Sequence, residues 1–189
     1  MIELHTSRKT ATPSGAAPVV ESLATLQQLT LEAGLSANPR QLVFRIVNHT
    51  ARYCHYDRAV LWRLSGKTPK LLGVSGNTEA NPQSPLAVEW RNLVEAISPR
   101  DRAMILRPER LNGKESAWNQ LTRRTNGLSV IWLPISVRQR VVAGLWLERW
   151  GNRQFSERDV TLLEALGVAY GVAWRGVARP PNVLVRTLE

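Results

Sequence analysis

The sequence predicts an α+β domain with a largely antiparallel sheet, because two strand pairs occur along the chain with helical patterns on either side. The clearer pair consists of Leu128–Ile135 and Val141–Trp150, two runs rich in β-branched and aromatic residues. The polar turn Ser136–Arg140 joins them. A second pair is predicted at Ala59–Leu64 and Lys70–Ser75. We therefore expect two hairpins in one sheet.

Two helices are expected before the first hairpin. Glu21–Ala33 has apolar residues at helical spacing and ends at Gly34, a typical C-terminal cap. A second helix begins at Asn38–Pro39 and ends near His55. Residues 1–20 have no periodicity and are rich in Thr, Ser, Pro and Ala, which predicts a flexible tail.

The stretch between the hairpins is predicted to be a variable insert. Leu86–Ile97 has the pattern of a short helix, and Arg102–Arg107 that of an edge strand. Pro108–Asn126 is long, polar and basic, so we expect a loop there, and binding residues often lie on such loops.

A long helix is expected to close the domain. Ser156 is its predicted N-cap, and Phe155 can pack against the first turn as a hydrophobic staple. Pro180–Pro181 should end the helical run. One apolar stripe runs along the helix and consists of Leu163, Leu166, Tyr170, Ala173 and Val177. This stripe predicts either packing within the chain or a homodimer through the terminal helices.

Length and composition fit one domain with tails. The chain has 189 residues, 43% of them hydrophobic, and a formal net charge of +10, which favours anionic partners. We expect a tail at 1–20, the domain at 21–178 and a linker at 179–189, whose closing Leu188–Glu189 resembles an expression-vector remnant. An uninterrupted apolar run of about 18 to 20 residues, as a membrane span requires, does not occur. With one cysteine, Cys54, and an N-terminus unlike a secretory signal, the sequence predicts a cytoplasmic location.

Three segments of the chain together resemble a GAF domain. They are Tyr56–Leu64, Leu133–Ile135 followed by Val141–Leu147, and Phe155–Leu163, and the resemblance extends over residues 21–178. It implies a sheet of five to six strands, with the first, second and last helices on one face. It also implies that the insert roofs a small-molecule pocket on the other face, and that the domain senses or regulates.

Tryptophans are the first candidates for such a pocket. Trp62, Trp132 and Trp146 fall in three strands that are neighbours in the sheet the family implies, so they can form a pocket floor or an ordinary core. Trp90 and Trp118 lie in the insert and are the better pocket candidates.

Arginines of the insert are the second candidates. Arg107, Arg110, Arg123 and Arg124 have the chemistry to bind a phosphate or carboxylate, such as that of a cyclic nucleotide. Charged loop residues also commonly face only water, so both interpretations stand.

The sequence contains no pattern typical of catalysis or of a metal site. The histidines are too few and too far apart, and Cys54 alone is typical of a buried structural residue. A methionine sulfoxide reductase needs several cysteines, and a bilin attachment is expected in the insert rather than in the second helix, where Cys54 lies. No nucleophile–base spacing or glycine-rich phosphate loop occurs. We therefore predict a non-enzyme without a cofactor.

The leading functional hypothesis is a cytosolic regulatory module that binds a small molecule or a protein segment. The alternative is an electrostatic binder of nucleic acid or of an anionic membrane surface. Nucleic acid is the weaker alternative because the basic residues are scattered. Arg175, Arg179 and Arg186 would suit the cytoplasmic flank of a membrane span, so we also expect the module to belong to a larger membrane protein, on the inner face of the membrane.

Overall fold

The computed structural model describes residues 16–77 and 79–177, which form helices and strands in the order of the chain. The helices are α1 (Ala16–Gly34), α2 (Pro39–His49), α3 (Pro85–Ala96), α4 (Glu115–Arg124) and α5 (Glu157–Val177), with short 3-10 helices η1 (Thr50–Arg52) and η2 (Pro108–Arg110). The strands are β1 (Arg58–Arg63), β2 (Lys70–Val74), β3 (Met104–Leu106), β4 (Leu128–Val137) and β5 (Arg140–Trp150).

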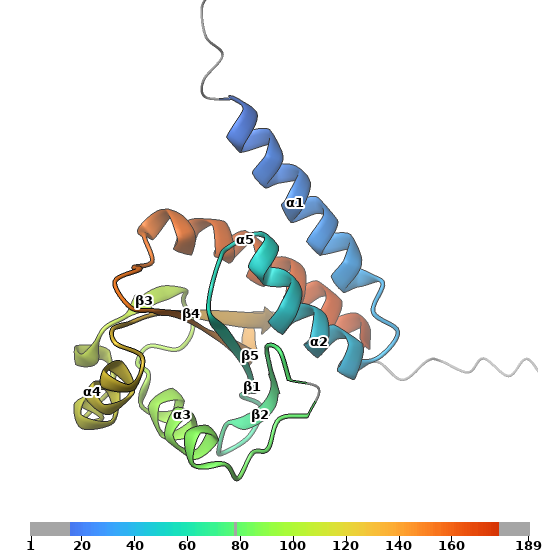
Figure 1. The fold of residues 1–189 in the computed structure, drawn as a ribbon. Coiled ribbons are helices and arrows are strands. Elements are labelled where there is room, and N and C mark those ends of the chain that lie inside the picture. The colour runs from blue at the N-terminus through green and yellow to red at the C-terminus, as the bar shows by residue number, and fades with distance from the viewer. Residues whose placement is uncertain (1–15, 78, 178–189) are drawn as a thin grey trace, which may run out of the picture.

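The five strands form one sheet in the order β2-β1-β5-β4-β3, and all neighbours are antiparallel. Figure 1 shows α1, α2 and α5 on one face of this sheet and α3 and α4 on the other. The predicted α+β class and the predicted division of the helices between the two faces are confirmed.

Alternation along each strand divides the core into two clusters. On β5, Leu145 and Leu147 point to the face covered by α1, α2 and α5, which we call the helix face. Trp146 points to the opposite face. The stripe predicted on the last helix packs on the helix face within the chain. Because this stripe packs within the chain, a homodimer would have to form through other residues of the terminal helices. The homodimer stays a prediction.

The two residues at which the sequence predicts helix starts, Asn38 and Ser156, lie at the starts of α2 and α5. Asn38 caps α2, since its side chain accepts a hydrogen bond from the backbone N–H of Gln41 at 2.9 Å, and Pro39 follows it. Ser156 accepts a hydrogen bond from the backbone N–H of Asp159 at 3.3 Å, and Asp159 accepts one from the backbone N–H of Ser156 at 2.7 Å. This reciprocal pair is a capping box at the start of α5.

The central hairpin is tighter than expected. Its turn consists of Arg138 and Gln139 alone, with φ of 49° and 63°, as in the two-residue turns that match the twist of paired strands. Pro134 lies one residue before a register irregularity between Ile135 and Ser136, which fits the prediction that it sits near a bulge.

Two segments differ from the sequence prediction. α1 begins at Ala16, five residues before Glu21, because Pro18 is acceptable in a first turn whose N–H groups need no helical partner. The interpretation of Pro108–Asn126 as a loop is wrong, since it contains η2 and α4. The buried residues of α4 are Trp118 and Leu121, and Ala117 packs beside them, so its apolar pattern was too sparse to recognise.

Candidate functional site

Five tryptophans gather on the sheet face opposite the terminal helices. Trp62 on β1, Trp132 on β4 and Trp146 on β5 come from adjacent strands, while Trp90 on α3 and Trp118 on α4 reach them from the insert. None of the five is more than 6% exposed. We call this cluster the tryptophan face.

Packing between the rings depends on one glycine. Trp132 and Trp146 lie directly opposite each other on β4 and β5. A Cβ at Gly144 would lie 2.0 Å from the Trp132 ring, so only glycine leaves room for that indole. Trp118 then meets Trp146 edge to face, with ring centroids 6.3 Å apart. The indoles therefore fill the space between the sheet and α4.

A buried carboxylate lies among the indole N–H groups. Oε1 of Glu148, on β5, accepts hydrogen bonds from Nε1 of Trp90 and of Trp146, both at 2.8 Å. Its Oε2 accepts one from Nε1 of Trp150 at 2.9 Å and lies 3.7 Å from Nη1 of Arg58. The carboxylate thus joins α3 to β5 through the side chain of Trp90.

Arg58 completes the surroundings of this carboxylate. Its guanidinium lies over the rings of Trp90 and Trp150, 5.0 and 4.7 Å from the centroids. Burial raises the pKa of Glu148, against the opposing effect of the indole hydrogen bonds and of the Arg58 charge. The arrangement holds a carboxyl group rigidly in an aromatic setting, without a nucleophile beside it.

Sequence reasoning missed Glu148 and Arg58. The only available signal was an acidic residue two positions after Trp146, on the same face of a strand that is otherwise apolar.

The remaining indole N–H groups of the cluster differ in their partners. Nε1 of Trp132 donates to the backbone oxygen of Arg100 at 3.0 Å. Nε1 of Trp62 is buried and has no hydrogen-bond partner among the described residues. The tryptophan face is therefore closely packed but has one unused donor.

The candidate arginines of the insert do not converge on the tryptophans. Arg107, Arg110 and Arg123 are exposed, and Arg124 forms an ion pair with Glu89 on α3 at 2.5 Å. The structure brings the five predicted tryptophans together and leaves these arginines exposed to solvent. A ligand-binding role for either group stays a prediction.

Cys54 lies in the core of the helix face, away from the insert. Burial raises the pKa of its thiol to about 12, so the thiol is a weak nucleophile near neutral pH. His49 contacts Glu32 on α1 at 2.7 Å. Among residues 16–77 and 79–177, no group of three or more His, Cys, Asp or Glu side chains is arranged to hold a metal ion.

Comparison with known families identifies the fold. Residues 38–174 match the model of the GAF domain family, and the chain belongs to that family. The match includes α2, the sheet, the insert and nearly all of α5.

Solved structures agree on the fold. The GAF domain of an Acinetobacter phosphoenolpyruvate-protein phosphotransferase is 16% identical, with a TM-score of 0.58 over 85% of this chain and 96% of that one. The corresponding domain from Coxiella burnetii is 13% identical, with a TM-score of 0.56 over 83% and 94%. The phycoerythrobilin-bound GAF domain of a cyanobacterial phytochrome is 12% identical, with a TM-score of 0.59 over 84% and 97%.

Comparison with curated proteins gave no match. Within the described residues, no helix has the length and apolar character needed to cross a membrane. The expected link to a larger membrane protein and the nucleic-acid alternative stay predictions.

Proposed function

We propose that this GAF domain is a non-catalytic regulatory module that acts by binding a protein segment, and that the segment is α1 and α5 of a second copy. One observation carries the proposal: large apolar side chains on the terminal helices are exposed. They form what we call the outer helix surface, which consists of Val20, Leu23, Leu31, Val168 and Val172, between 58% and 71% exposed.

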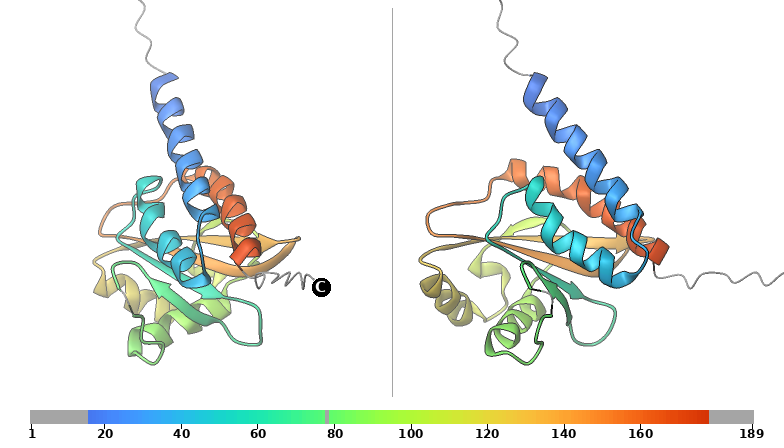
Figure 2. Two further views of the ribbon diagram at one scale, coloured as in Figure 1. Left: turned by 90° about the vertical axis from the view of Figure 1, so that its right-hand side faces the viewer. Right: turned by 45° about the vertical axis from the view of Figure 1, so that its right-hand side comes forward.

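Single exposed apolar residues are common on monomers, but these five lie on two neighbouring helices. Figure 2 shows α1 beside α5, with the first turns of α1 extending past the rest of the domain. The inward residues of both helices, such as Leu29 and Leu166, already contact the core. The outward residues are thus free to contact a second chain.

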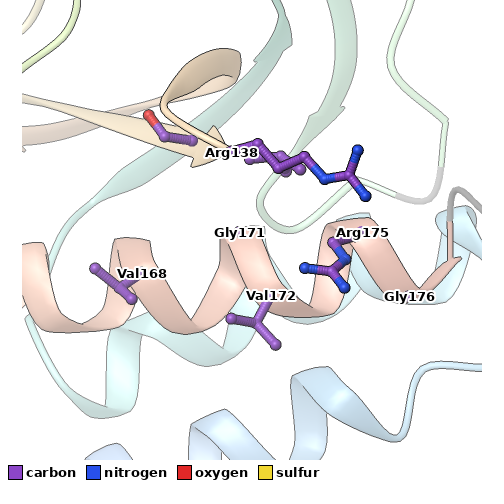
Figure 3. A pocket seen from close by; sticks show the side chains of 8 residues that line it. Arg138, Val168, Gly171, Val172, Arg175 and Gly176 are labelled. Atoms are coloured by element: carbon purple, nitrogen blue, oxygen red, sulfur yellow. The ribbon is translucent and has the colours of Figure 1, made fainter.

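A groove next to α5 extends the outer helix surface. It has a volume of about 430 Å³ and lies between the tip of the β4–β5 hairpin and Val168, Val172 and Arg175. Gly171 keeps the hairpin close, because a Cβ there would lie 2.2 Å from the backbone oxygen of Ser136. Figure 3 shows Val172 pointing away from the hairpin, with Arg138 and Arg175 near the C-terminal end of the groove. An apolar side chain of the partner helix fits beside these valines.

The packing of the tryptophan face favours the hypothesis of a protein partner over that of a small-molecule ligand. Its indoles occupy the side of the sheet on which the insert lies, and three of their N–H groups already bind Glu148 or, in Trp132, a backbone oxygen. A ligand there would have to displace these contacts. Association through the helices requires no such rearrangement.

The test is the mass of the protein by light scattering at high concentration. We expect a dimer for the wild type. The double variant Val168→Arg and Val172→Arg should weaken it by about a hundredfold, since it removes apolar contacts and places like charges at the seam. Both positions are exposed, so the fold should persist, as circular dichroism can verify.

The matched control is Ser116→Arg with Gln120→Arg. Both residues are exposed on α4, on the opposite side of the sheet, and the control adds the same charge. It should leave the mass unchanged. A monomeric wild type, or equal effects of the two double variants, would reject the proposal.

A further inference from the structure

A second groove lies at the edge of the sheet, between α2 and β2. Its volume is about 550 Å³, within the range of small-molecule sites. Trp174 of α5 and the loop after β2 complete its wall. Figure 1 shows α2 next to the β1–β2 hairpin, on the opposite side of the sheet from α3 and α4, so this groove is separate from the tryptophan face.

Apolar side chains form one part of the wall, next to the charged and polar residues. Val43, Phe44 and Val47 come from one side of α2, and Leu72 comes from β2. Phe44 is 52% exposed although it is a large aromatic residue. A Cβ at Gly73 would lie 2.6 Å from Cγ1 of Val43, so glycine allows β2 to approach α2 this closely.

The charges at the groove are unbalanced. Arg40, at the start of α2, and Arg63, at the end of β1, both contribute to its lining. Within the described part of the chain, neither guanidinium forms an ion pair or a hydrogen bond. Glu79 is the acidic residue of the lining, so two positive charges face one negative charge.

This charge pattern selects the ligand class. An arginine fork binds a carboxylate well, and two unpaired arginines favour a negative group. Because Glu79 offsets one of the two arginines, the groove has a net charge of +1, which favours a monoanionic ligand over a dianionic one. The aromatic and aliphatic walls require an apolar body next to the charged group.

We propose that this groove binds an amphipathic monoanion, with its carboxylate on Arg40 and Arg63 and its apolar body against Val43, Phe44 and Trp174. The site shares none of the five residues of the outer helix surface, and although Trp174 also lies on α5, the dimer variant tested below separates the two proposals.

Sodium 2-naphthoate is a suitable probe. Titration at millimolar concentration, followed by amide NMR shifts of Val43 and Gly73 in the wild type, should give saturable binding. Neutral 2-naphthalenemethanol should bind about tenfold more weakly, because a charge-assisted hydrogen bond is lost. Absence of saturable naphthoate binding, or equal affinity for the alcohol, would overturn the proposal.

Two variants with equal charge loss locate the site. Arg40→Ala with Arg63→Ala should weaken naphthoate binding by at least about tenfold. Arg107→Ala with Arg123→Ala removes two exposed arginines of the insert and should leave it unchanged. The reverse pattern would place the anion at the insert instead. The dimer variant Val168→Arg with Val172→Arg should still bind naphthoate, which separates this test from that of the dimer.

Discussion

On the helix face of the sheet the core is mostly aliphatic, whereas the tryptophan face encloses a carboxylate among indole rings. Leu145 and Leu147 on β5 belong to the core cluster of the helix face, while Trp146 and Glu148, their immediate neighbours, point the other way. Aliphatic contacts have no preferred direction, so they constrain the orientation of the helices less than hydrogen bonds do. Hydrogen bonds to Glu148 fix angles as well as distances.

This difference indicates which face is suited to transmit a change. The terminal helices pack mainly through aliphatic contacts, with one buried hydrogen bond at 2.6 Å between the hydroxyl groups of Tyr170 on α5 and Thr50, and they carry the outer helix surface. A shift of α3 would break the bond between Trp90 and Glu148 and leave buried polar atoms without partners. We infer that the tryptophan face is the rigid side of the domain.

The largest expected effect comes from Glu148→Ala. It leaves the indole N–H groups of Trp90, Trp146 and Trp150 and the charge of Arg58 without their acceptor. We expect the free energy of unfolding to fall by about 3–5 kcal/mol, as measured by urea denaturation.

Glu148→Gln is the matched control, since it keeps one oxygen acceptor at nearly the same size. We expect its free energy of unfolding to fall by less than that of the alanine variant. If the alanine variant is as stable as the wild type, the tryptophan face is not held by its carboxylate, and the contrast between the two faces fails.

A smaller effect is expected from Gly144→Ala, which tests how closely the rings pack. The added methyl group would meet the Trp132 ring, so we expect a loss of about 1–3 kcal/mol from overpacking. Gly176→Ala, on α5, meets nothing within 4 Å and should stabilise the helix by up to about 1 kcal/mol. In thermal unfolding, the midpoint temperature should fall for Gly144→Ala and rise for Gly176→Ala. A neutral Gly144→Ala would show that the tryptophan face accommodates an added methyl group, and would contradict the close packing assigned to it.

Much of this fold could be predicted because its signals are local. The two hairpins follow from short runs of β-branched and aromatic residues with polar turns between them, and the caps at Asn38 and Ser156 follow from residues a few positions apart. The resemblance to a GAF domain then placed Trp62, Trp132 and Trp146 in neighbouring strands, as the structure confirms.

The polar centre of the tryptophan face could not be predicted in the same way. Glu148 and Trp90 are 58 positions apart, so no spacing rule connects them. An acid in a strand is usually expected to face water, and only the tertiary fold shows indole donors around it. α4 was missed for a related reason, because two large apolar residues, Trp118 and Leu121, are too few to define a helical period.

The smallest expected effect concerns Glu32, an acidic residue of α1 on the helix-face side of the sheet. It lies on α1 and accepts hydrogen bonds from Arg52, while His49 contacts it at 2.7 Å, so it ties α1 to the end of α2 and to η1. The hydrogen bond from Arg52 is the main cause that lowers the pKa of Glu32 from 4.5 to about 2. Because the pair is partly exposed, Glu32→Gln should cost no more than about 1 kcal/mol.

The pH dependence of that cost sharpens the contrast between the two acids. A lowered pKa means that the stabilisation by Glu32 is complete above pH 4.5 and is lost as the pH falls towards 2. The difference in unfolding free energy between the wild type and Glu32→Gln should therefore shrink on acidification. Glu148 has a raised pKa, so its contribution should be greatest below pH 4.5 and decline as the pH rises through that raised value. Urea denaturation of wild type, Glu32→Gln and Glu148→Gln should show a contribution of Glu32 that grows between about pH 2 and 4.5, and a contribution of Glu148 that declines as the pH rises above 4.5, so the two slopes have opposite sign. Slopes of the same sign would mean that the two carboxylates do not experience the exposed and buried settings assigned to them.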